Sequence, residues 1–270
     1  MPRSMSGVLL TIIGVYVVAC GALFAAQKKL LYFPTGNPAL PAQQLLTINV
    51  DGATINVSTR SASSSNAVVY FGGNAEDVSM SLPDIAQAFP GHAIYMVHYR
   101  GYGGSSGKPS EKALHADAQA VYDHVSDRHA DIVVIGRSLG SGVAVRLAAV
   151  NPLERLVLVT PFDSIVNVAK DGFPIFPVRL LLTERFESWR YASAISVATT
   201  IVAAEKDEVI SLARTRALYA AFNPDIIRFE TIKGVGHNDI SATPAYVHAL
   251  GKTQQHSAPS STTGAAEQAH

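Results

Sequence analysis

Short, almost continuous apolar runs alternate with longer mixed stretches along most of the chain, a pattern that predicts alternating strands and helices. Strands are predicted at 67–71, 93–99, 131–135, 156–160, 200–204 and 226–231, and helices at 79–89, 111–128, 139–150, 212–222 and 243–252. Residues 45–60 predict a β-hairpin that turns at Asp51 and Gly52. Apolar strands separated by helices predict an α/β fold, with a mostly parallel sheet covered on both faces.

The N-terminal residues 4–27 carry no charge and are long enough to span a bilayer as a helix. An uncleaved membrane anchor is favoured, because the apolar run continues to Ala26 without a polar cleavage region. The alternatives are a lipoprotein signal lipidated at Cys20, a secretory signal cleaved after Ala26, and a buried core helix. The anchor, the lipoprotein signal and the secretory signal each place the chain at or across a membrane. Its orientation stays open, because Arg3 before the run and the lysines at 28–29 after it nearly balance.

Composition divides the chain into three parts. Residues 1–29 form the anchor or signal segment, residues 30–252 one folded domain, and residues 253–270 a tail. The tail is rich in Ser, Thr, Ala, Gln and Pro and has almost no large apolar group, so we expect it to be disordered.

Charge and cysteine content exclude several classes of function. The 21 basic residues balance the 21 acidic ones, and no basic block occurs, so nucleic-acid binding is not expected. The single cysteine, Cys20, excludes an intrachain disulfide framework and a cysteine-based metal site.

The most informative motif is Gly-Arg-Ser-Leu-Gly at 136–140, which lies between a predicted strand and a predicted helix. A strand, a sharp turn and a helix are the context in which this motif forms a nucleophile elbow. The turn holds its serine in a strained conformation, and a Cβ at either flanking position would clash, which the two glycines avoid. The sequence therefore predicts Ser138 as an exposed nucleophile at the start of a helix, where the helix dipole favours a developing oxyanion.

A nucleophilic serine needs a histidine base and an acid that orients the base. In this arrangement the acid and the histidine follow the serine in the chain, each on a loop after a strand. Asp207 follows the strand predicted at 200–204, and His237 follows the last strand. Asp163, after the strand at 156–160, is the main alternative acid.

Two backbone N–H groups are needed to bind an oxyanion. Leu139 N–H directly follows the serine, and Asn74 N–H, in the glycine-rich loop at 72–77, is the second candidate. Another glycine-rich loop, at 101–107, lacks the residues of a phosphate loop and is expected to line the floor of the site. We expect no cofactor and no metal.

Residues 163–196 interrupt the alternation of strands and helices with an apolar insertion. It is too apolar for an ordinary loop, and we favour a cap that folds over the serine and shapes an acyl pocket. Packing of these groups onto the sheet is the alternative. Phe162, Phe173 and Phe176, together with Gly73, are the expected substrate contacts.

Together these segments resemble the α/β-hydrolase superfamily, and within it the membrane-anchored serine hydrolases of the bud-emergence and α/β-hydrolase-domain type. The resemblance covers about residues 30–252 and rests on the segments at 32–34, 70–77, 99–103, 107–111, 136–140, 160–165, 207–210 and 236–239. It implies a serine hydrolase that acts on acyl esters or thioesters at membranes. The chain departs from the family's usual His-Gly-Asn with Gly72-Gly73-Asn74, and from His-Gly before the acid loop with Ala203-Ala204.

The expected function is cleavage of carboxylic esters or thioesters with an apolar acyl group by Ser138, His237 and Asp207 at a membrane. The substrate is expected to be a small or lipid-like acyl ester, and no obligate protein partner is evident. A serine peptidase on the same fold and a catalytically silent binding protein are the alternatives. We also expect that removal of residues 1–29 releases a soluble, active enzyme.

Overall fold

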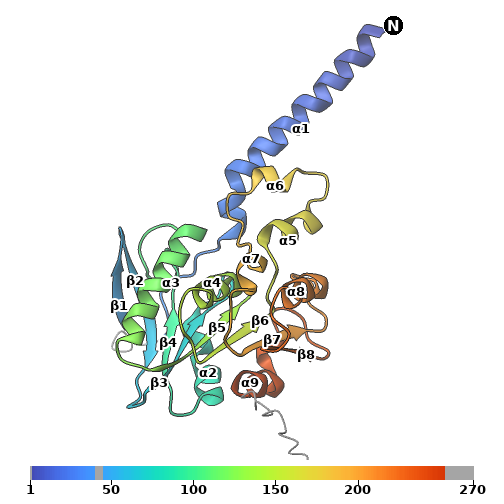
Figure 1. The fold of residues 1–270 in the computed structure, drawn as a ribbon. Helices are drawn as coiled ribbons and strands as arrows, with labels where there is room; N and C mark the ends of the chain where they lie inside the picture. The colour runs from blue at the N-terminus through green and yellow to red at the C-terminus, as the bar shows by residue number, and fades with distance from the viewer. Residues whose placement is uncertain (1, 40–44, 253–270) are drawn as a thin grey trace, which may run out of the picture.

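The computed structural model describes residues 2–39 and 45–252, which contain one eight-stranded sheet (Figure 1). The strand order is β1-β2-β4-β3-β5-β6-β7-β8. The strands are β1 (Leu45–Val50), β2 (Ala53–Arg60), β3 (Asn66–Phe71), β4 (Ala93–Val97), β5 (Asp131–Arg137), β6 (Arg155–Val159), β7 (Thr199–Ala204) and β8 (Ile227–Ile232). Strands β3 to β8 are parallel, and the β1–β2 hairpin joins β4 antiparallel at one edge. The predicted α/β fold is confirmed.

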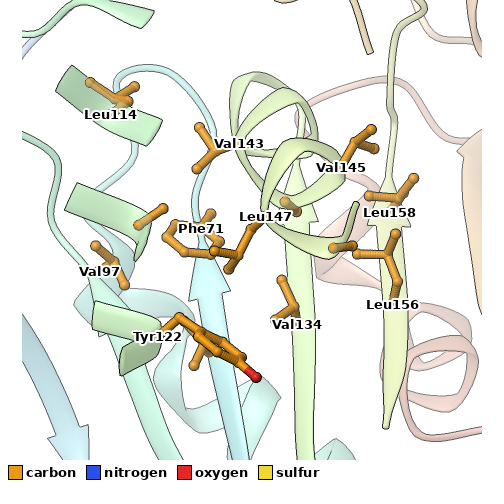
Figure 2. Packing of buried hydrophobic residues seen from close by; sticks show 14 of the residues in the cluster. Phe71, Val97, Leu114, Tyr122, Val134, Val143, Val145, Leu147, Leu156 and Leu158 are labelled. Atoms are coloured by element: carbon orange, nitrogen blue, oxygen red, sulfur yellow. The ribbon is translucent and has the colours of Figure 1, made fainter. Parts of the chain in front are cut away.

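Alternate residues of the central strands point to opposite faces of the sheet and form two cores. Val69 and Phe71 belong to one core, whereas Val68 and Tyr70 belong to the other. The first core is covered by α3 (Glu111–Ser126), α4 (Leu139–Ala148) and α8 (Leu212–Tyr219), and the second by α2 (Leu82–Ala88) and α9 (Pro244–Gly251). Figure 2 shows α4 packed over β3, β5 and β6 in the first core. This packing fixes the turn between β5 and α4, where the candidate nucleophile lies.

The N-terminal segment is a single helix, α1 (Pro2–Leu31), that projects from the domain (Figure 1). Within the 27-residue stretch Met5–Leu31, the most apolar 18 residues have a mean hydropathy of 2.5, and none of them is buried. The helix is therefore long and apolar enough to cross a membrane. It is not a buried core helix, which was one of the three alternatives to a membrane anchor.

The apolar insertion folds into three short helices, and the second of them lies beside the lower part of α1 (Figure 1). They are α5 (Ile165–Gly172), α6 (Val178–Leu181) and α7 (Trp189–Ala192). We call residues 163–196 the cap. The tail expected to be disordered, 253–270, lies outside the described residues.

Candidate active site

The turn between β5 and α4 holds Ser138 in the conformation expected of a nucleophile elbow. Ser138 has φ 48° and ψ −115°, a left-handed region that L residues rarely adopt. A Cβ on Gly140 would lie 2.1 Å from the Phe71 carbonyl oxygen, and one on Gly136 would lie 2.5 Å from the Gly140 carbonyl oxygen. Only glycine fits at these two positions, so the sequence determines how closely α4 approaches the end of β3.

Three side chains from separate loops meet beside this turn. His237, in the loop after β8, places Nε2 2.9 Å from Ser138 Oγ. Its Nδ1 lies 2.8 Å and 3.0 Å from the two carboxylate oxygens of Asp207, which follows β7. With Nδ1–H donating to Asp207, the lone pair on Nε2 is free to accept the Ser138 proton. The structure therefore brings all three residues expected to form a triad into one hydrogen-bonded chain.

Asp207 is held rigidly by its own loop. Its Oδ1 accepts the backbone N–H groups of Val209 at 2.9 Å and Ile210 at 2.7 Å. The side chains of Asp207 and His237 are only 2% and 6% exposed. Because the ion-pairing partners are shielded from water, the carboxylate can stabilise an imidazolium more strongly than it could in solvent.

The alternative acid, Asp163, has other partners. Its carboxylate accepts the Ser164 backbone N–H at 2.9 Å and the Asn167 amide at 2.6 Å. Arg214 also contacts it at 3.3 Å. The geometry thus favours Asp207 over Asp163 as the partner of His237.

The glycine-rich loop after β3 runs along the serine. A Cβ on Gly73 would lie 3.6 Å from Ser138 Cβ, so this backbone passes next to the nucleophile. The N–H of Gly73 donates to Glu76 at 2.6 Å. Leu139 is the first residue of α4 and is 3% exposed. These placements are compatible with Leu139 N–H and Asn74 N–H as the two oxyanion donors.

The Asn74 side chain joins this loop to the end of α1. Its amide Nδ2 donates to the Leu31 carbonyl at 2.6 Å, and its Oδ1 accepts the Tyr102 hydroxyl at 2.8 Å and the Phe33 N–H at 3.0 Å. Asn74 therefore links the glycine-rich loop after β3 to the base of the N-terminal helix by hydrogen bonds.

Sequence reasoning missed a buried ion pair beneath this loop, between Glu76 and Arg137. Glu76 Oε2 accepts the Gly73 N–H and contacts Arg137 at 3.2 Å, and Oε1 accepts the hydroxyls of Tyr70 and Ser81. Arg137 also donates to the His237 carbonyl at 3.4 Å. Burial opposes the charge of Arg137, but the Glu76 carboxylate favours it, and the pKa of Arg137 is raised overall.

A cavity of about 510 Å³ lies beside the triad, between α1, the cap and the acid loop. Asp207 and Phe173 line it, but Ser138 and His237 do not. Among the other expected substrate contacts, Phe162 is 1% exposed and belongs to the core. Phe176 stacks on Tyr16 of α1, with ring centroids 5.8 Å apart.

A larger open depression of about 1520 Å³, between α2 and α9, includes none of the triad residues. Among residues 2–39 and 45–252, no group of three His, Cys, Asp or Glu side chains is arranged to hold a metal ion. The triad and the cavity next to it are therefore the site with the clearest chemistry.

Comparison with known proteins shows the family and the fold of this chain. The model of the "Alpha/beta hydrolase family" matches residues 68–265. The chain is 33% identical to an uncharacterized protein of Mycobacterium tuberculosis over 83% of its own length and 86% of the relative's. It is 28% identical to protein bem46 of Schizosaccharomyces pombe, over 88% and 89%. The Pyrococcus furiosus esterase Pf2001 shares the fold, with a TM-score of 0.66 at 18% identity over 82% of this chain and 96% of that one.

Proposed function

This chain belongs to the alpha/beta hydrolase family, and from that premise we propose that it is a serine hydrolase that cleaves carboxylic esters or thioesters with an apolar acyl group at a membrane. The observation that carries the proposal is the continuous hydrogen-bonded chain from Ser138 Oγ through His237 to Asp207. Nucleophile, base and orienting acid are what acyl transfer to a serine requires.

In the proposed reaction, Ser138 Oγ attacks the substrate carbonyl carbon while His237 Nε2 takes the hydroxyl proton. The tetrahedral intermediate places its negative oxygen against the N–H groups of Leu139 and Asn74. As the intermediate collapses, His237 returns the proton to the leaving alcohol or thiol, and an acyl-enzyme remains. Water then attacks the acyl carbonyl as His237 Nε2 takes its proton. When this second intermediate collapses, His237 returns the proton to Ser138 Oγ, the acyl–oxygen bond breaks, and the carboxylic acid leaves.

Preference for an apolar acyl group is supported by the cavity beside Asp207. Its walls carry many apolar side chains, among them Leu31, Val168, Phe173, Leu181 and Leu182. Its volume of about 510 Å³ lies within the roughly 300–1,000 Å³ of small-molecule sites. Membrane action is supported by α1, whose apolar stretch has the length of a spanning helix.

Covalent labelling with a fluorophosphonate probe tests the proposal. The full-length protein in detergent should gain one adduct, which peptide mapping places on Ser138, and Ser138→Ala should gain none. Ser141→Ala is a matched control, because Ser141 lies one helical turn away and donates to the Ser138 carbonyl rather than to the base. A wild-type protein that takes up no probe and hydrolyses no p-nitrophenyl ester would be a binding protein instead.

A further inference from the structure

The lower half of α1 is docked against the cap rather than joined to the domain by a free tether (Figure 1). Gln27, 8% exposed, is the main attachment. Its Oε1 accepts the Thr183 N–H at 2.8 Å and the Thr183 hydroxyl at 3.0 Å, and its Nε2 donates to the Leu181 carbonyl at 3.2 Å. An amide with three bonds to one cap segment holds the helix at a fixed height and rotation.

The base of α1 is fixed by a second set of contacts around Glu184 of the cap. The buried Glu184 carboxylate accepts the Tyr32 hydroxyl at 2.5 Å and the backbone N–H of Glu111 at 2.5 Å. Lys28, in the last turn of α1, lies 3.4 Å from the same carboxylate. The helix therefore enters the folded domain at one defined position.

The cavity beside the triad lies between these two docked parts. Leu23 and Leu31 of α1 form one wall, and Val168, Phe173 and Leu181 of the cap form another. Asp207 belongs both to the lining and to the triad. An acyl chain held between α1 and the cap would thus lie alongside the group that orients His237.

The cap contacts α1 far from the base of the helix. If α1 spans a membrane, the cap residues at this contact lie within the hydrocarbon. Tyr16 donates to the Ile175 carbonyl at 2.8 Å and stacks on Phe176. Tyr16 precedes Leu31 by 15 residues, which is about 22 Å along a helix. The stretch Met5–Leu31 is about 40 Å long, so it exceeds a hydrocarbon core of ~30 Å by about 10 Å. Even if this whole excess lay at the Leu31 end, a spanning α1 would put its contact with Ile175 about 12 Å inside the hydrocarbon boundary.

The cap segment that reaches this contact is mostly apolar and exposed. We call residues 173–180 the cap tip. Within it, Ile175 is 72% exposed, Leu180 84% and Phe173 48%, and its one charged residue, Arg179, is also exposed. Such a cluster is unfavourable in water but suits the interior of a bilayer, where its apolar surface would be buried.

We propose that the cap tip is inserted in the bilayer, that α1 is one wall of the acyl site, and that the acyl chain of a membrane lipid ester enters the cavity from the hydrocarbon. The chain passes between α1 and the cap, and the ester carbonyl then reaches Ser138. This inference rests on the proposed serine hydrolase function. It also replaces the expectation that residues 1–29 are dispensable, because their removal would delete Leu23 and Gln27 from the cavity wall.

The test uses full-length protein in phosphatidylcholine vesicles. The vesicles carry p-nitrophenyl palmitate in the bilayer, p-nitrophenyl butyrate is supplied from the water, and the readout is the ratio of the two values of kcat/KM. Leu23→Trp, which fills the cavity from the α1 side, should lower the palmitate-to-butyrate ratio about tenfold. Val18→Trp, on the same helix but 72% exposed and outside the cavity lining, should leave it unchanged.

A second pair of variants tests insertion of the cap tip. Ile175→Asp should lower the same ratio about tenfold, because a carboxylate resists entry into hydrocarbon. Met80→Asp is the control, because Met80 is 67% exposed in η2 (Val78–Ser81), outside the cap. If Leu23→Trp loses activity on both esters, Val168→Trp on the opposite wall is measured instead. It should lower the palmitate-to-butyrate ratio in the same way.

The outcomes separate the two proposals. A wild type that hydrolyses neither ester and takes up no fluorophosphonate contradicts the serine hydrolase function itself. Two other outcomes overturn only the membrane-facing acyl site. One is normal butyrate turnover with an unchanged palmitate-to-butyrate ratio in Leu23→Trp or Ile175→Asp. The other is an equal loss of both esters in both Leu23→Trp and Val168→Trp. An intact mass that shows cleavage after Ala26 also overturns this site alone, because such a chain lacks Leu23.

Discussion

Asp207 and His237 are joined by two short contacts, 2.8 Å and 3.0 Å from His237 Nδ1 to the carboxylate oxygens, although 30 positions separate them in the chain. Both belong to loops at the carboxyl ends of parallel strands, β7 and β8, which pair directly. The register of these two strands therefore places the acid beside the base before any side chain adjusts.

This pairing predicts unequal effects of two conservative substitutions. Asp207→Asn should lower kcat on p-nitrophenyl butyrate by on the order of 10⁴, because the amide favours the wrong imidazole tautomer. Asp163→Asn is the matched control and should cost far less, since Asp163 bonds Asn167 and Arg214 instead. Steady-state kinetics of both variants decide the matter, and a larger loss in Asp163→Asn would transfer the role to that residue.

The ion pair of Glu76 and Arg137, beneath the glycine-rich loop after β3, should stabilise the folded protein. Glu76→Ala leaves the Arg137 guanidinium, whose side chain is 12% exposed, without its carboxylate. Breaking a buried pair in this way costs about 3–5 kcal/mol in the free energy of unfolding, measured by urea denaturation of the purified protein. Glu230→Ala breaks the exposed pair with Lys252 and should cost under about 1 kcal/mol. Equal costs for the two variants would show that the Glu76 pair does not stabilise the loop.

The tight turn at the nucleophile predicts that Gly140 tolerates no side chain. Gly140→Ala brings a Cβ within 2.1 Å of the Phe71 carbonyl oxygen, so α4 or the end of β3 must shift. We expect esterase activity to fall by at least about 100-fold, because small displacements of catalytic groups are that costly. Gly36→Ala, where nothing lies within 4 Å of the added Cβ and which does not line the cavity, should keep wild-type activity. Normal turnover in Gly140→Ala would rule out the close approach of α4 to β3.

Buried His98 predicts a loss of stability in acid. Burial lowers the pKa of His98 to about 4, partly offset by Asp77, and its Nε2 contacts the Ser58 hydroxyl at 2.8 Å. Between the ordinary pKa of about 6.5 and the folded value of about 4, the unfolded chain binds a proton that the folded chain excludes. Stability should therefore fall as the pH drops through this window, by about 3 kcal/mol in total.

Urea unfolding at pH 7 and pH 4.5 measures this effect. His98→Asn should be less stable than wild type at pH 7 but should lose less stability on acidification. A loss equal to that of wild type would assign the acid sensitivity to other groups.

Much of the fold could be predicted because each strand is a local apolar run. The strands from β3 to β8 begin and end within two residues of their predicted bounds, and the chain order of Ser138, Asp207 and His237 places them at one sheet edge. Contacts between segments far apart in the chain have no local sequence pattern, so they could not be predicted. Gln27 is one amide in an apolar helix, and its partner Leu181 lies 154 positions away.

The buried ion pair could not be predicted from the sequence for the same reason. Glu76 was a loop residue and Arg137 the variable position of the elbow motif, and only the sheet brings them within 3.2 Å. Phe162 was expected to contact the substrate because of its place in the sequence. It borders the insertion, but its ring packs in the core near Gly142, a glycine that leaves room for it on α4.

The most direct test of the central claim is kcat/KM of Ser138→Ala on p-nitrophenyl butyrate, measured beside wild type. The hydroxyl of Ser138 contacts His237 at 2.9 Å and the residue is only partly exposed, so its loss should leave the circular dichroism spectrum and the thermal midpoint close to wild type. The account predicts a loss of on the order of 10⁴ to 10⁶ in turnover. Activity within about tenfold of wild type would contradict it.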